Sequence, residues 1–166
     1  MDILKLANEW AKAEIFSSKF FILFGLVFLA GSIGFWQLAK TETARAFIYP
    51  TLVAGILILA VGIGLFFTNK SRLNNFASAY EADPVAFVQS EINRAEKTVA
   101  EFKTVVFTAI PIIIAIASLL LIFVDRPIWR AISITTIAMM AVILLVDSNS
   151  STRIDDYRKQ LEMVDK

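Results

Sequence analysis

The chain has 166 residues, 57% of them hydrophobic, and its formal net charge at pH 7 is +1. An ordinary soluble domain is about 45–50% apolar, so the composition argues against that class. The near-neutral charge gives no case for nucleic-acid binding. The sequence contains no cysteine and no histidine, which excludes disulfides, thiol chemistry and the commonest metal ligand.

Four apolar runs account for the excess hydrophobicity. Each is about 20 residues long, the length at which a helix crosses a hydrocarbon core. The first run follows a segment that contains acidic residues, so we expect a membrane span there and not a cleaved signal peptide. The sequence therefore predicts an all-α membrane protein with four transmembrane helices, at residues 20–38, 47–67, 104–124 and 127–146.

The distribution of lysine and arginine predicts the orientation of these spans. The chain has 16 such residues, and most of them precede the first span, follow the fourth, or lie between the second and third. Cytoplasmic segments are enriched in Lys and Arg. Both termini are therefore predicted to lie in the cytoplasm, with the spans in the plasma (inner) membrane. The exceptions, in or beside the two short loops on the other side, are Lys40, Arg45, Arg126 and Arg130.

Each span is predicted to continue as a helical arm on the cytoplasmic side. Apolar residues recur in the arms at steps of three and four, which is the period of one helix face. The longest such stripe begins at Val85, passes through Ile92 and ends at Val106. The opposite face, which includes Glu91 and Arg94, is predicted to be solvated. Because an isolated arm is too short to be stable, the arms are expected to pack together as a cytoplasmic four-helix bundle.

The chain divides near its middle. Asp83 is a favourable N-cap and Pro84 a favourable first helical residue, so one helix should end and another begin there. Short polar loops join the first span to the second and the third to the fourth. The sequence thus predicts two antiparallel hairpins, residues 1–83 and 84–166, integrated into one bundle. Pro111 is expected to kink the third span.

A short internal echo suggests that the two hairpins are copies of one unit. Residues 71–76 and 152–157 match in chemical type at all six positions, and both segments follow a span. A duplication of this kind would relate the halves by an axis along the membrane normal. The alternative is that any hairpin leaving a membrane needs polar residues followed by an apolar stripe. The sequence leaves both explanations open.

Five polar residues are candidates for functional contacts. The echo places Arg72 and Arg153 at the membrane exit, where each can contact lipid phosphates or a neighbouring arm. Ser32, Thr135 and Thr136 lie inside spans, where hydroxyl groups either line a pore or support helix packing.

Small residues in the first two spans predict close helix packing. Ala30 and Gly34 are four residues apart, the spacing at which two helices in lipid can approach closely. The second span carries Gly55, Gly62 and Gly64. These residues indicate that spans one and two offer faces on which a neighbouring helix can pack.

The sequence predicts no catalytic, cofactor or metal site. No nucleophile-and-base set stands out, and no ionisable residue lies at mid-bilayer, which argues against coupled transport. We expect a structural, accessory or assembly subunit that acts through helix packing, as a homo-oligomer or within a larger membrane complex. The alternative is a homo-oligomeric passive channel. The predicted partners are the lipid bilayer and other membrane subunits.

Overall fold

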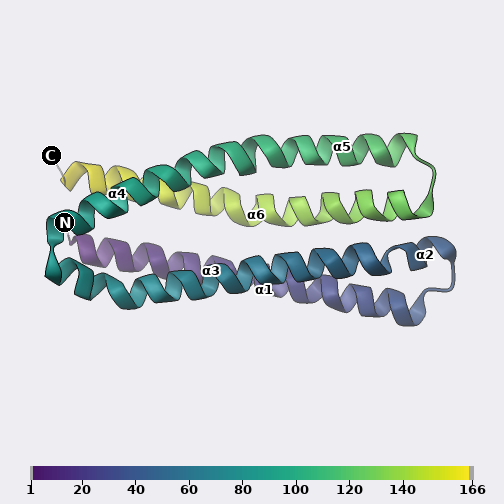
Figure 1. The fold of residues 1–166 in the computed structure, drawn as a ribbon, viewed down its shortest axis with the longest axis horizontal. Coiled ribbons are helices and arrows are strands. Elements are labelled where there is room, and N and C mark those ends of the chain that lie inside the picture. The colour runs from purple at the N-terminus through teal and green to yellow at the C-terminus, as the bar shows by residue number, and fades with distance from the viewer. Residues whose placement is uncertain (1, 165–166) are drawn as a thin grey trace.

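The protein is all-α in the computed structural model, which describes residues 2–164 (Figure 1). No strand occurs in that range, so the all-α part of the predicted fold class is confirmed. Four stretches are long and apolar enough to cross a membrane: Ile3–Leu38, Glu42–Ala82, Pro84–Phe123 and Pro127–Met163. The helices are α1 (Ile3–Leu38), α2 (Glu42–Ala46), α3 (Ile48–Ala82), α4 (Pro84–Glu101), the π-helix η1 (Phe102–Ala109), α5 (Ile110–Phe123) and α6 (Pro127–Val164).

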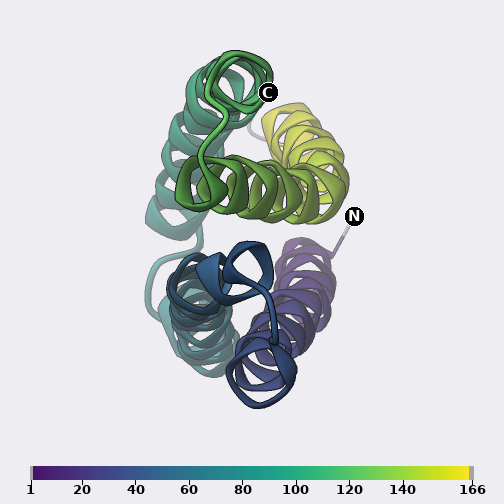
Figure 2. The same cartoon turned by 90° about the vertical axis from the view of Figure 1, so that its right-hand side faces the viewer.

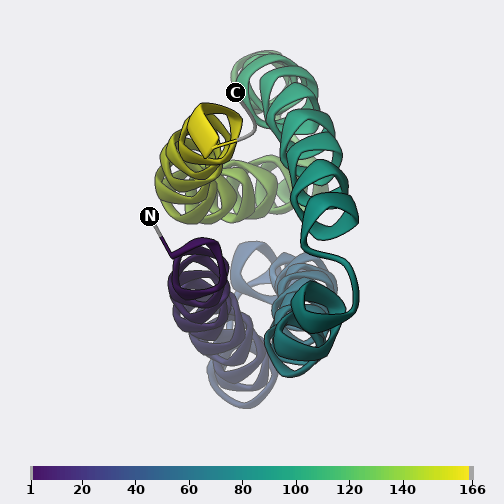
Figure 3. The same cartoon turned by 90° about the vertical axis from the view of Figure 1, so that its left-hand side faces the viewer.

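The helices run side by side along one long axis (Figure 1). The α1–α2 and α5–α6 connections lie at one end, called here the loop end. The α3–α4 turn and both termini lie at the other, called the arm end. Towards the loop end the helices are stacked in the order α5, α6, α3, α1 (Figure 2). At the arm end α1, α3, α4 and α6 surround a common centre (Figure 3).

The break between α3 and α4 falls where the sequence predicts it. α3 ends at Ala82, and Pro84 opens α4. Between them, Asp83 Oδ1 accepts a hydrogen bond from the backbone N–H of Ala86 at 3.0 Å. The loop after α1 differs from expectation, because it contains the short helix α2. Thr41 caps α2 by accepting a hydrogen bond from the N–H of Ala44 at 3.2 Å.

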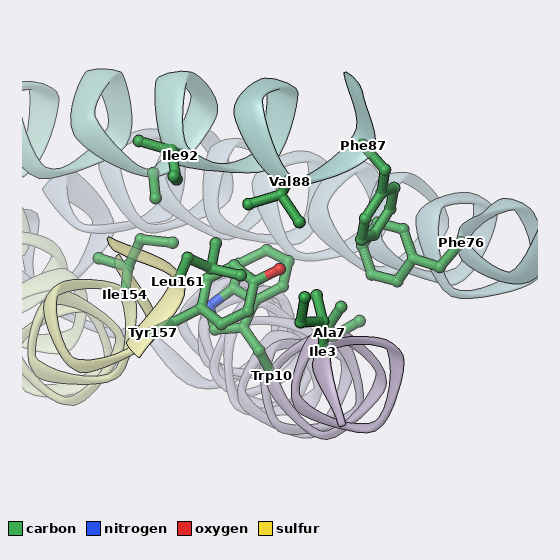
Figure 4. Packing of buried hydrophobic residues seen from close by; sticks show 12 residues of the cluster. Ile3, Ala7, Trp10, Phe76, Phe87, Val88, Ile92, Ile154, Tyr157 and Leu161 are labelled. Atoms are coloured by element: carbon green, nitrogen blue, oxygen red, sulfur yellow. The ribbon is translucent and has the colours of Figure 1, made fainter. Parts of the chain in front are cut away.

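The arms share one hydrophobic core, which we call the arm core (Figure 4). It takes residues from α1, α3, α4 and α6, so no arm buries its stripe alone. Burial of this kind stabilises each arm by about 25 cal/mol per Å² of apolar surface removed from water. The buried members are Ile3, Ala7, Trp10, Ala11, Phe76, Phe87, Val88, Ile92, Ala95, Ile154, Tyr157 and Leu161.

The buried stripe on α4 begins at Phe87, two residues later than the predicted start at Val85. Val85 is 74% exposed, whereas Phe87 is buried. The Phe87 ring packs edge-on against Phe76 and Tyr80, with ring centroids 5.6 Å apart in each pair. The prediction that Val85 joins the stripe is therefore wrong. Phe87 fills the space beside α3, and the first turn of α4 then directs Val85 to solvent.

The distortion expected at Pro111 lies on its N-terminal side. The eight residues Phe102–Ala109 form η1, whose bonding shifts to the fifth residue back: the Ile110 N–H donates to the Val105 carbonyl. Proline cannot donate a backbone bond and crowds the preceding turn. A π-segment is an alternative way to absorb that conflict. It also changes the phase of the helix, so the even stripe predicted through Val106 does not run straight into α5.

Three glycines set the close packing of α1 on α3. A Cβ at Gly25 would lie 2.8 Å from the Leu59 backbone nitrogen, and one at Gly55 would lie 2.9 Å from that of Leu29. A Cβ at Gly62 would lie 2.8 Å from the backbone nitrogen of Ile22. Only glycine allows backbones so close. The Ala30 and Gly34 pair is not at this contact, since Ala30 is exposed and Gly34 faces open space.

Candidate functional site

A buried polar cluster lies inside the arm core. Glu91 of α4 is buried, and its carboxylate accepts a hydrogen bond from Arg94 Nε at 2.9 Å and one from the Tyr157 hydroxyl at 2.8 Å. The Arg94 guanidinium lies 4.1 Å from the centre of the Trp10 ring. Trp10 stacks on Tyr157 with centroids 5.4 Å apart, and the two rings overlap in Figure 4. The cluster thus joins α1, α4 and α6.

This cluster corrects the prediction that Glu91 and Arg94 lie on a solvated face. A pair of opposite charges three residues apart is typical of an exposed helix surface. Here α6 and α1 cover that surface: the Tyr157 hydroxyl donates a hydrogen bond to Glu91, and the face of the Trp10 ring packs against the Arg94 guanidinium. The sequence feature that could have indicated this burial is the presence of Trp10 and Tyr157 in other arms. A tyrosine hydroxyl can hydrogen-bond a buried carboxylate, and an aromatic ring face can pack against a guanidinium.

Replacement of Tyr157 by phenylalanine tests the cluster. Burial, reinforced by the Glu91 carboxylate, raises the pKa of the Tyr157 phenol, so the hydroxyl remains a donor at all physiological pH values. A hydrogen bond to a buried charged group contributes about 1.5–3 kcal/mol. We expect Tyr157→Phe to lower the unfolding free energy by about 2 kcal/mol, measured by thermal unfolding in detergent. The control is Tyr80→Phe, because the Tyr80 hydroxyl forms no hydrogen bond with residues 2–164. This substitution should change stability by less than about 0.5 kcal/mol.

Arg153 of the second echo segment joins the α6 arm to the α1 arm. Its guanidinium donates to Glu14 at 3.0 Å and to the Ser17 hydroxyl at 2.6 Å. It also donates to Ser150, one turn earlier on α6, at 2.8 Å. Of the two roles considered for Arg153, this is the contact with a neighbouring arm. A lipid contact stays a prediction.

Arg72 of the first echo segment is less well satisfied. Its Nη1 donates to Asn69 Oδ1, one turn earlier on α3, at 3.0 Å. Arg72 forms no ion pair among residues 2–164, because no carboxylate oxygen there lies within 4.0 Å of its guanidinium nitrogens. The side chain is partly buried, and this burial, with the nearby charge of Arg94, lowers the pKa of Arg72.

Arg72 lies on the wall of a cavity between the helices. The cavity has a volume of about 510 Å³, within the range of small-molecule sites. α1, α3, η1 with the end of α4, and α6 all contribute to it. Its polar part includes Glu14, Asn69, Arg72, Arg94, Asp147 and Ser150. Its apolar part includes Leu57, Val61, Leu65, Val105, Met139 and Ile143. The cavity therefore joins the polar arms to the apolar halves of the helices.

Asp147 on the cavity wall carries an unusual carboxyl group. Burial, and to a smaller extent the Glu14 carboxylate, raises the pKa of Asp147 from 3.8 to about 7. The unfolded chain ionises this group near pH 4, and the folded chain does so only near pH 7. The contribution of Asp147 to folding stability is therefore expected to fall as the pH rises from about 4 to about 7 and to be level above that range.

Asp147→Asn should remove this contribution. We expect the variant to be more stable than the wild type at pH 8, by about 1–3 kcal/mol, because the wild type must bury a charge there. At pH 4 the two proteins should be equally stable. Asp156→Asn, an exposed position on the same helix, is the control. Equal stability of wild type and Asp147→Asn across this pH range would contradict the raised pKa.

The hydroxyl residues of the spans lie apart from this cavity. Ser32 is buried and donates to the Ile48 carbonyl at 2.8 Å, which ties α1 to the start of α3. Thr135 is buried and Thr136 is partly buried. Both threonines line a recess of about 320 Å³ between α3 and α6, beside Val53 and Ile132. The structure thus brings Thr135 and Thr136 together and leaves Ser32 elsewhere.

Residues 2–164 contain no group of three or more Asp and Glu side chains arranged to hold a metal ion. The cavity combines guanidinium and amide donors with three carboxyl groups, those of Glu14, Glu101 and Asp147, and with aliphatic walls. The sequence did not reveal it. The available signal was a small polar residue one turn before each echo arginine, Asn69 and Ser150.

Comparisons of the chain with protein-family models, with curated proteins and with solved structures find no match.

Proposed function

We propose that the chain is an integral membrane protein whose loop-end halves lie in the bilayer and whose arms lie in the cytoplasm. Support comes from the exposed side chains. Leu23, Ile56, Ile116 and Leu145 lie in the four apolar runs, one in each, and all are more than half exposed. Soluble monomers rarely expose so much continuous apolar surface, whereas lipid would cover it. The arms expose charged residues such as Lys5 and Lys97.

Cysteine labelling tests both the insertion and the orientation, because the natural chain has no cysteine. Thr43→Cys places a thiol at the loop end, and Ala77→Cys places one on an arm, both at exposed positions. We expect a membrane-impermeant maleimide to label Thr43→Cys in intact cells and Ala77→Cys only after permeabilisation. The reverse pattern would overturn the orientation. Extraction of the protein from membranes by alkaline carbonate would overturn the insertion.

Within the membrane, we infer a structural or accessory role that works through helix packing. The observation that supports it is the open face of α1 at Ala30 and Gly34. Gly34 has no atom of another helix within 4 Å of where its Cβ would be, and Ala30 is exposed. Two small residues at this spacing allow a further helix to approach closely. A second copy of the chain or a larger membrane subunit would supply that helix.

Mass measurement of the protein in nanodiscs tests this role. We expect a homo-oligomer, or a constant partner captured by cross-linking in cells, and we expect Gly34→Leu to disrupt the assembly. Gly64→Leu, at an open position on α3, is the matched control. A strict monomer with no partner would contradict the proposal. A ring of four or more copies that passes ions in liposomes would replace it with the channel alternative. Ser32 and Thr135 are buried within one chain, so they do not supply the lining of such a pore.

A further inference from the structure

We propose that the cavity at the boundary of arms and spans binds an anionic phospholipid. Its phosphate would lie at Arg72, and one acyl chain would lie along the apolar wall between α3 and η1. This inference relies on the proposed membrane location, but it does not depend on any oligomer or partner.

Arg72 is the cavity-lining cation for which the described residues supply no ion pair. Glu14 pairs with Arg153 at 3.0 Å, and Glu91 pairs with Arg94. Two further carboxyl groups line the cavity: Glu101 pairs with Lys97 at 4.0 Å, and burial raises the pKa of Asp147 to about 7, so its carboxyl group is largely neutral below that pH. Arg72 faces the cavity with a single amide partner, Asn69. A partly buried guanidinium is costly unless an anion or several acceptors satisfy it. A phosphate group fits the forked donors of arginine, so it is the natural complement.

The apolar wall begins where the guanidinium ends. Leu57, Val61, Leu65, Asn69 and Arg72 follow one another along α3 at steps of four, four, four and three residues, so they share one helix face. All five line the cavity. The strip from residue 57 to residue 72 is roughly 22 Å long at 1.5 Å per residue. That length accommodates much of an acyl chain, with the charged group at its end.

The cavity opens towards the surface that lipid would cover. Leu57 and Val61 on α3 are 51% and 48% exposed, and Val105 on the facing η1 is 53% exposed. All three are cavity-lining residues. A lipid could therefore enter sideways from the bilayer without unfolding the arms. Arg72 lies five residues beyond the predicted end of the span at residue 67, about the depth of the headgroup phosphates.

Native mass spectrometry in detergent, with lipid added, tests the charge. We expect the wild type to retain phosphatidylglycerol in preference to phosphatidylcholine. Arg72→Gln should weaken phosphatidylglycerol binding about tenfold, the loss expected for one charge-assisted interaction. Lys70→Gln, an exposed cation two residues away on the same helix, is the control and should bind as the wild type does. Equal effects of the two substitutions would overturn the proposal, because they would indicate general attraction to a basic surface.

A second pair of variants tests the apolar wall without touching a charge. Val105→Trp should fill the cavity and weaken lipid binding, whereas Ile112→Trp, on the exposed face of α5 outside the cavity, should not. Unchanged binding by Val105→Trp would overturn the proposal even if Arg72→Gln failed to fold.

Glycerol phosphate distinguishes a lipid site from a site for a free phosphate. We expect it to compete weakly, since it lacks the acyl chain. Competition as strong as that of phosphatidylglycerol would overturn the lipid proposal. Failure of the maleimide labelling would instead overturn the membrane location, so the two results are separable.

Discussion

Ile92→Asp is expected to prevent stable folding of the arms. Ile92 is 6% exposed and lies in the arm core, on the α4 face that packs towards α6. Aspartate there would remove an apolar side chain and bury an unpaired charge. Loss of a large buried aliphatic group costs about 2–5 kcal/mol, and an uncompensated buried charge adds to it. We expect the unfolding free energy to fall by about 4 kcal/mol or more, measured by thermal unfolding in detergent.

Val85→Asp is the matched control for this prediction. Val85 belongs to the same apolar pattern on the same helix, but it is exposed, so a charge there should cost less than about 0.5 kcal/mol. Comparable damage by the two substitutions would mean that the arm core is not formed as described. It would indicate instead that a partner covers the whole stripe.

Gly62→Leu is expected to separate α1 from α3. The new Cβ would lie 2.8 Å from both the Ile22 backbone nitrogen and the Phe21 Cβ, so the helices must move apart to admit it. Overpacking of a core typically costs about 1–3 kcal/mol. We expect about 3 kcal/mol here, because backbone atoms cannot rotate away as a side chain could. The measurement is thermal unfolding of the purified variant.

Gly64→Leu controls for the loss of glycine itself. No neighbouring atom lies within 4 Å of the Cβ position at Gly64, and this residue occupies the same helix. Leucine has a higher helix propensity than glycine, so the control should be neutral or slightly stabilising. If Gly62→Leu were equally harmless, the close crossing of α1 and α3 would be contradicted.

Local patterns predicted the helices well because their causes are local. The apolar runs indicated the long helices, and Asp83 with Pro84 indicated the break between α3 and α4. The same reasoning failed where a neighbouring helix decides the outcome. Phe87 replaced Val85 in the core because α3 offers a partner ring, Phe76. Glu91 is buried because Tyr157, 66 positions away, completes its bonding.

In the candidate site, too, the local features could be predicted from the sequence and the contacts between helices could not. Arg72 and Arg153 stood out in the sequence by their matching surroundings, and each donates to a polar residue one turn earlier, Asn69 or Ser150. Their outer partners differ, since Glu14 meets only Arg153. Because of this difference, Arg72 lies on the cavity wall without an ion-pair partner. No pattern within either echo segment predicts the difference. The duplication itself stays a prediction.

The glycine-mediated contact of α1 with α3 has a consequence for biosynthesis. All the atoms that form it belong to the first 62 residues, so the two helices can pair before α4–α6 leave the ribosome. Nascent chains generally assemble unit by unit from the N-terminus. The later helices would then pack against a preformed pair, with α6 contacting both of its members. We therefore expect substitutions at Gly25 or Gly62 to reduce the yield of folded protein, in addition to lowering the stability of what is made.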